Sequence, residues 1–201
     1  MKRVICCLDG TWNHNRPGAI LTNVCKLHQA IAASDGNGVQ QVSHYIEGIA
    51  SAEAESIPIL TGGIGFDVDD RVRKAYEVLA RSYEPGDEIY LFGFSRGAFE
   101  ARSLGSLMSL VGIAKAGGAF VLDKAWSLYQ TPEARRDPAV LAELRAAAHY
   151  PVRIKCIGVW DTVGNLGNPF VSGSFGNRRY AFHDMRLTEN IEVALHAPLD
   201  R

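Results

Sequence analysis

Four short strand-like runs alternate along the chain with longer segments of helical periodicity, and this alternation limits the fold more than any other feature. The runs are Val4–Leu8, Gln41–Ile46, Ile89–Phe94 and Ile154–Trp160. The first, third and fourth are nearly continuous in apolar residues, which is typical of strands that are buried on both faces. Strands and helices that alternate in this way predict an α/β fold, with a mainly parallel sheet and helices on both faces.

The helical segments carry recognisable end signals. Thr22 or Asn23 can cap a helix that runs through Ile31, and Asp137 can cap a helix that opens with Pro138. Further helices are predicted over residues 68–83, 96–113 and 119–129, and a last amphipathic helix over 187–195. The 201 residues fit one domain, because neither a linker nor an internal repeat divides them.

The charge balance excludes several classes of partner. The chain has 21 basic and 22 acidic residues, mixed along its length, for a formal net charge of -1. This balance argues against a nucleic-acid groove or a polybasic membrane patch. The first apolar run is interrupted by Asp9 and is too short for a signal peptide, and no run is long enough to span a membrane. We therefore expect synthesis in the cytoplasm.

The cysteines do not suggest a metal site. Cys6, Cys7, Cys25 and Cys156 show neither C-x-x-C nor zinc-ligand spacing. We expect reduced thiols, and we expect the protein to need neither a metal nor another cofactor.

One run leads directly into a candidate catalytic turn. Ile89–Phe94 ends in the sequence Gly93-Phe94-Ser95-Arg96-Gly97, and a helical pattern follows. In a strand–turn–helix elbow of this kind, side chains at the two glycine positions would collide with neighbouring backbone, and the serine hydroxyl is lifted to the carboxyl edge of the sheet. The N–H of Arg96 points into the same space and can hold a developing oxyanion. Ser95 is therefore expected to be the nucleophile of an α/β-hydrolase-like domain.

A serine nucleophile needs a base, and the base needs an orienting acid. Asp161 directly follows a predicted strand, where the acid of this fold belongs, although a carboxylate there can also merely cap backbone amides. After Asp161 the histidines are His183 and His196. Because His196 falls at the end of the last predicted helix, its imidazole is expected to lie outside hydrogen-bond range of Ser95.

Several segments together resemble the bacterial family of type VI secretion lipase effectors. They are Leu8-Asp9-Gly10-Thr11-Trp12-Asn13, Thr22-Asn23-Val24-Cys25-Lys26-Leu27, Gly86–Ala98, Gly158-Val159-Trp160-Asp161-Thr162-Val163-Gly164 and Leu195-His196-Ala197. The resemblance implies a serine esterase that acts on lipid-like carboxylic esters, with phospholipids as the best-known substrates. It also implies export by a secretion system that reads no signal peptide, with a component of that system or an immunity protein as partner.

The resemblance assigns further roles to the loop after the first strand. Gly10 or Thr11 is expected to donate a second N–H to the oxyanion, and Asp9 and Trp12 are expected to contact the substrate. The chain departs from the family after Ala197, where the family continues with a strand and a glycine-rich segment that holds its histidine. The domain is therefore expected to lack that segment. Either His196 is the base, or the chain is a hydrolase-fold remnant that acts as a binding module.

Two other motifs could indicate different functions, and neither fits. Asp9-Gly10-Thr11 after a strand resembles the loop of phosphatases with the sequence Asp-x-Asp-Gly-Thr, but Cys7 stands where the nucleophilic aspartate would be. The segment Gly62-Gly63-Ile64-Gly65 fits neither a Walker loop nor a dinucleotide fingerprint, and the acidic turn after it would repel phosphate. It is expected to form a loop near the active site.

Overall fold

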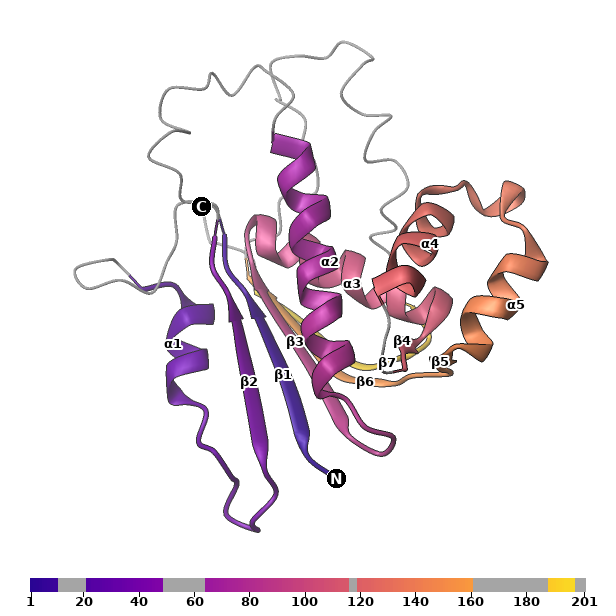
Figure 1. Cartoon of the computed structure of the whole chain (residues 1–201). Helices are drawn as coiled ribbons and strands as arrows, with labels where there is room; N and C mark the ends of the chain where they lie inside the picture. Colours follow the sequence, from indigo (N-terminus) through magenta and orange to yellow (C-terminus); the bar gives the residue numbers. More distant parts are fainter. Residues whose placement is uncertain (11–20, 49–63, 116–118, 161–187, 198–201) are drawn as a thin grey trace.

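The computed structural model describes residues 1–10, 21–48, 64–115, 119–160 and 188–197, with side chains at all of these except 64–67 and 119–121. A five-stranded sheet in the order β2-β1-β3-β6-β7 forms the centre (Figure 1). Its strands are β1 (Arg3–Leu8), β2 (Gln41–Ile46), β3 (Glu88–Phe94), β6 (Ile154–Trp160) and β7 (Ile191–Ala197). Every pairing in this sheet is parallel.

Five α-helices are found in the described part of the chain. They are α1 (Asn23–Ala30), α2 (Ile64–Ser82), α3 (Arg96–Val111), α4 (Ala119–Gln130) and α5 (Pro138–Ala146). Two predicted caps are confirmed: the Thr22 side chain accepts from the N–H of Cys25, and Asp137 accepts from the N–H of Ala139. No helix in the described ranges is both long and apolar enough to cross a membrane.

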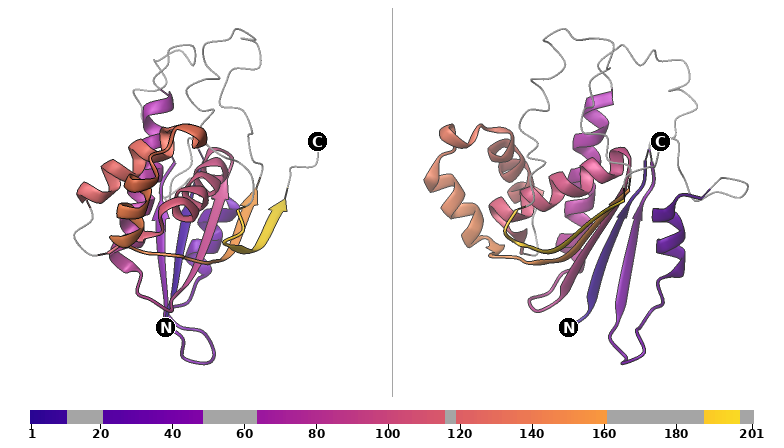
Figure 2. Two further views of the ribbon diagram at one scale, coloured as in Figure 1. Left: turned by 90° about the vertical axis from the view of Figure 1, so that its right-hand side faces the viewer. Right: turned by 180° about the vertical axis from the view of Figure 1, so that it is seen from behind.

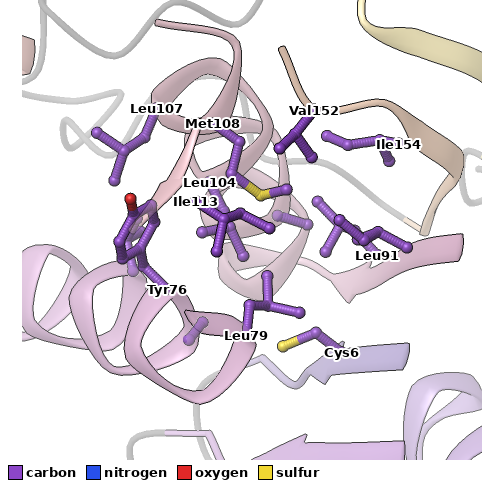
Figure 3. Packing of buried hydrophobic residues seen from close by; sticks show 14 of the residues in the cluster. Cys6, Tyr76, Leu79, Leu91, Leu104, Leu107, Met108, Ile113, Val152 and Ile154 are labelled. Atoms are coloured by element: carbon purple, nitrogen blue, oxygen red, sulfur yellow. The ribbon is translucent and has the colours of Figure 1, made fainter. Parts of the chain in front are cut away.

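The helices form layers on both faces of the sheet (Figure 2). Alternate residues of β1 belong to different clusters: Val4, Cys6 and Leu8 lie in the main core with α2, α3 and α4. Ile5 and Cys7 lie in a smaller cluster with Val24 of α1. The main core fills the space between the helices and the sheet (Figure 3). The predicted α/β fold, with a mainly parallel sheet and helices on both faces, is therefore confirmed.

The C-terminal part of the prediction is wrong. Residues 191–197 form strand β7, at the edge of the sheet beside β6 (Figure 2), instead of the last helix expected over 187–195. Ile191, Val193 and Leu195 alternate with other residues, which is the period-two signal of a strand. His196 consequently lies within a strand.

Two smaller expectations are also corrected. A two-stranded antiparallel sheet pairs β4 (Ile113–Ala114) with β5 (Ala148–His149), so the helices before them end at Val111 and Ala146. His149 lies in β5. Of the glycine-rich segment 62–65, Ile64 and Gly65 already belong to α2 rather than to a loop, and residues 62–63 lie outside the described part.

Candidate active site

Ser95 occupies a strained turn between β3 and α3. Its backbone has φ 53° and ψ -116°, and it is the one non-glycine residue with positive φ in the described part of the chain. Such a conformation is costly for a residue with a side chain, and it persists only where the surroundings enforce it. The Ser95 N–H donates to the Trp160 carbonyl at 2.9 Å, and its own carbonyl accepts from the Ala98 N–H at 3.1 Å. The turn is thus fixed to β6 on one side and to α3 on the other.

The two glycines of the motif are required by close backbone contacts. A Cβ placed on Gly93 would lie 2.3 Å from the Gly97 carbonyl oxygen. A Cβ on Gly97 would lie 2.2 Å from the Leu8 carbonyl oxygen and 2.8 Å from that of Asp9. Neither position can accept a side chain without movement of backbone. The first turn of α3 therefore packs directly against the end of β1, as expected for an elbow of this kind.

Asp9, at the end of β1, is buried, and its carboxylate is fully engaged. Oδ1 accepts the N–H of Gly10 at 2.7 Å. Oδ2 accepts the hydroxyls of Thr22 at 2.7 Å and Tyr45 at 2.5 Å. Burial, followed by the hydrogen bond to Asp9, raises the pKa of Tyr45, so this phenol stays protonated and donates. These contacts favour a role for Asp9 in holding the end of β1 over direct contact with substrate. The bond to Oδ1 also occupies the N–H of Gly10.

A second buried cluster lies against the same strand end. Arg71 of α2 donates from Nη2 to the Asp9 carbonyl at 2.7 Å, and from Nη1 to the Glu47 carbonyl. Its Nε lies 2.9 Å from Oε2 of Glu100 in α3, a fully buried carboxylate. The sequence did not single out Tyr45, Arg71 or Glu100, because partners that are 24 to 62 residues apart leave no local pattern.

Other predicted site residues lie outside the described part. They are Thr11, Trp12, Asp161 and His183. The strand before Asp161 is described: Trp160 is the last residue of β6 and pairs with Phe94, the last residue of β3. β6 therefore ends at the edge of the sheet where Ser95 lies.

His196 lies on β7 opposite Val159, which in turn pairs with Gly93. Two strand spacings, about 10 Å, separate its strand from the strand that leads to Ser95. The residue is exposed, and it lies in a strand instead of at the end of a helix. No hydrogen bond joins it to Ser95 among the interactions of the described residues.

The described cysteines and acidic groups were compared with the requirements of a nucleophile and of a metal site. Burial raises the pKa of the Cys7 thiol to about 12, so this thiol stays neutral at physiological pH. Cys6, Cys7 and Cys25 are buried free thiols, and Cys156 is partly buried. Within the described ranges, no group of three or more His, Cys, Asp or Glu side chains is arranged to hold a metal ion.

Two known proteins are similar to this chain. An uncharacterised protein of Saccharomyces cerevisiae is 30% identical over 188 residues, which cover 83% of this chain and 27% of that protein. A crystal structure of an uncharacterised protein from Pseudomonas aeruginosa aligns with a TM-score of 0.49 at 16% identity, over 98% of this chain and 35% of that one. The chain thus spans about a quarter of the length of the yeast relative and about a third of the bacterial one.

A family model matches nearly the whole chain. It spans residues 2–199 and describes the catalytic domain of Tle1-like phospholipase effectors of the type VI secretion system (T6SS). The match includes the strand that leads to Ser95, the elbow itself and strand β7. The chain therefore belongs to the T6SS Tle1-like phospholipase effector catalytic-domain family.

Proposed function

We propose that this chain is the catalytic domain of a serine esterase that cleaves phospholipid-like carboxylic esters, with Ser95 as the nucleophile. The observation that carries the proposal is the backbone of Ser95, which has φ 53° in a turn that two close-packed glycines enforce. Strain of this kind gathers at functional sites, because a purely structural turn has no need of it. The family description supplies the lipase-type chemistry and the phospholipid class.

The proposed reaction follows from the groups around the turn. Ser95 Oγ attacks the ester carbonyl carbon while a base takes the hydroxyl proton, and the carbonyl oxygen gains negative charge. Arg96 is the first residue of α3, and its backbone N–H stabilises that oxyanion, aided by the positive end of the helix dipole. The base then gives its proton to the departing alcohol, and water hydrolyses the acyl-enzyme by the reverse sequence.

Asp161 is proposed as the acid that orients the base. Support comes from the end of β6, where the Trp160 carbonyl accepts from the Ser95 N–H at 2.9 Å. Asp161 directly follows Trp160 in the chain, and consecutive Cα atoms lie about 3.8 Å apart. Gly10 or Thr11 is proposed as the second oxyanion donor and Trp12 as a substrate contact. The hydrogen bond from the Gly10 N–H to Asp9 favours Thr11 for the oxyanion role.

The base is the weakest part of the triad. His196 is the candidate base in the described part. Its exposed position on an edge strand favours the alternative, a hydrolase-fold domain that keeps the elbow but lacks a base. Such a protein would bind lipid-like ligands or a partner without cleaving them. The proposed secretion-system or immunity-protein partner suits either function.

Ester hydrolysis tests the proposal. The purified chain should release p-nitrophenol from short-chain p-nitrophenyl esters and fatty acid from phosphatidylglycerol vesicles. Ser95→Ala should abolish both activities, and Asp161→Asn should lower turnover by about 10⁴, by analogy with the acid of serine proteases. Ser109→Ala, at the other end of α3, is the matched control and should keep full activity. Equal activity in wild type and Ser95→Ala would exclude nucleophilic catalysis by this residue.

A further inference from the structure

Arg71 has contacts that a helix residue normally lacks. Arginines of amphipathic helices usually extend into solvent, but this side chain is 8% exposed. Its guanidinium reaches the end of β1 through the Asp9 carbonyl, the end of β2 through the Glu47 carbonyl, and α3 through Glu100. A single planar group therefore connects four elements at the carboxyl edge of the sheet.

These contacts join the end of β1 to the helix that begins at the proposed nucleophile. Glu100 lies four residues after Arg96, about one turn along α3, so a contact with Glu100 holds the start of this helix. The Asp9 carbonyl belongs to the peptide group whose N–H is on Gly10, and a peptide group is planar. Holding that carbonyl sets the direction in which the chain leaves β1 beside the elbow.

The second side of the same peptide group is fixed as well. The Gly10 N–H donates to Asp9 Oδ1 at 2.7 Å, and the Asp9 carboxylate is in turn held by Thr22 and Tyr45. Tyr45 lies on β2 and Thr22 caps α1, so these bonds approach from the face opposite α2. The peptide between Asp9 and Gly10 is thus held from both faces of the sheet.

We infer that Arg71 is a positioning residue of the proposed esterase, which holds the end of β1 at Asp9 against the first turns of α3 and so fixes the Arg96 N–H beside Ser95 for the developing oxyanion. The inference rests on the proposed function, because it assigns these contacts to catalysis. A desolvated ion pair is costly to bury, and well-packed apolar side chains often replace one without loss of stability. Stability alone therefore does not account for Arg71 and Glu100.

The test uses the rate of labelling by a fluorophosphonate. In this reaction an Oγ–P bond forms, the P–F bond breaks, fluoride leaves and the hydroxyl proton passes to the base. The phosphoryl oxygen occupies the oxyanion site, so the rate reports its geometry. Arg71→Lys keeps the charge beside Glu100 but loses the planar fork of donors. Arg73→Lys is the matched control, on the same helix at a partly exposed ion pair with Asp123.

We expect Arg71→Lys to lower the labelling rate and kcat by about 10²-fold with KM little changed, because a displacement of about 1 Å at the site has effects of that size. Arg73→Lys should match wild type. The double variant Arg71→Met/Glu100→Leu removes the buried charges together and should remain folded, with the same loss of rate. Circular dichroism and thermal melting give the folded fraction, so that each rate refers to folded protein.

The outcomes separate the two proposals. If wild type is labelled and both Arg71 variants react at the wild-type rate when folded, the ion pair is structural and the inference is wrong. If folded wild type is not labelled at all, the proposed function fails, and the positioning role falls with it. If Arg71→Lys is slow only because KM rises, the residue affects substrate binding and the inference is also overturned.

Discussion

Ser95 shows how a single backbone conformation can indicate chemistry. The sequence motif alone is common, because glycine and serine are frequent residues. Its context, an apolar run before it and a helical pattern after it, made the elbow predictable. The structure adds the physical cause: two glycines allow backbone-to-backbone contact, and the serine between them takes positive φ. The role of that serine in catalysis remains the proposal to be tested.

Gly97→Ala should disrupt the elbow. Alanine favours helix over glycine by about 1 kcal/mol, but its Cβ would meet the Leu8 carbonyl oxygen at 2.2 Å, so the clash should dominate. We expect a net loss of about 1–3 kcal/mol of stability, as for other overpacked sites, with loss of Ser95 labelling. Chemical denaturation measures the first effect. Gly36→Ala, where no atom lies within 4 Å of the new Cβ, is the control and should change neither.

His196→Ala should leave Ser95 labelling within about threefold of wild type. The imidazole is exposed on β7, and its strand lies two spacings, about 10 Å, from the strand of the elbow. His183→Ala is the companion variant, since His183 also follows Asp161 in the chain. A loss with His196→Ala as deep as that with Ser95→Ala, in folded protein, would show that His196 is the base after all.

Two partly buried histidines form hydrogen bonds with serines at strand β2 and its neighbouring helices. His28 Nδ1 of α1 lies 2.7 Å from the Ser43 hydroxyl, and His44 Nε2 lies 2.8 Å from the Ser82 hydroxyl of α2. Burial lowers the pKa of both histidines below 6.5, and the neighbouring His28 further lowers that of His44. Protonation of either ring is therefore less favourable in the folded chain than in the unfolded one.

These shifts predict a loss of stability in mild acid. Because the folded pKa values are depressed, the unfolded state binds more protons once the pH falls below about 6.5, and the free energy of unfolding decreases until both forms are protonated. Denaturation with urea at pH 7.5, 6.5 and 5.5 should show the decrease. His28→Gln/His44→Gln should flatten the profile between these values, while His196→Gln on the exposed edge strand should not. An unchanged profile in the double variant would contradict the assignment.

The strands show which local signals are sufficient. β1, β3 and β6 lie in the interior of a parallel sheet, and each is a nearly continuous apolar run in the sequence, although alternate residues of β3 are only partly buried. β7 is an edge strand with mostly exposed side chains, and its apolar positions were mistaken for one face of a helix. Two-residue strands such as β4 and β5 are too short to leave any period. The sequence therefore predicts the interior strands and the edge strand β2, but not the edge strand β7.

The candidate site also has a part that the sequence predicts and a part that it does not. The elbow was found because its residues are adjacent in the chain. The hydrogen bonds that hold its surroundings join Asp9 to Tyr45, 36 residues away, and Arg71 to Glu100, 29 residues away. Buried charges in such clusters have the same residue types as a solvated helix face, so their function depends on tertiary contacts alone. No pattern in one sequence could have separated them.

In the described part of the chain, β1 and β6 end at the same edge of the sheet as β3, the strand that leads to Ser95. Family membership over residues 2–199 gives this arrangement a lipase-type context. The yeast relative is much longer, with 27% of its length matched, so the activity of a full-length protein remains a proposal that the isolated unit can test in part.

The most direct test of the account is the location of a fluorophosphonate adduct, read by peptide mass spectrometry after incubation with folded protein. The account predicts one adduct, on Ser95, which is lost in Ser95→Ala and kept in Ser109→Ala. Ser109 is a fair control because it shares helix α3 but lies far from the turn. Folded wild type that carries no adduct, or an adduct that persists in Ser95→Ala, would contradict the claim that this strained serine is an activated nucleophile.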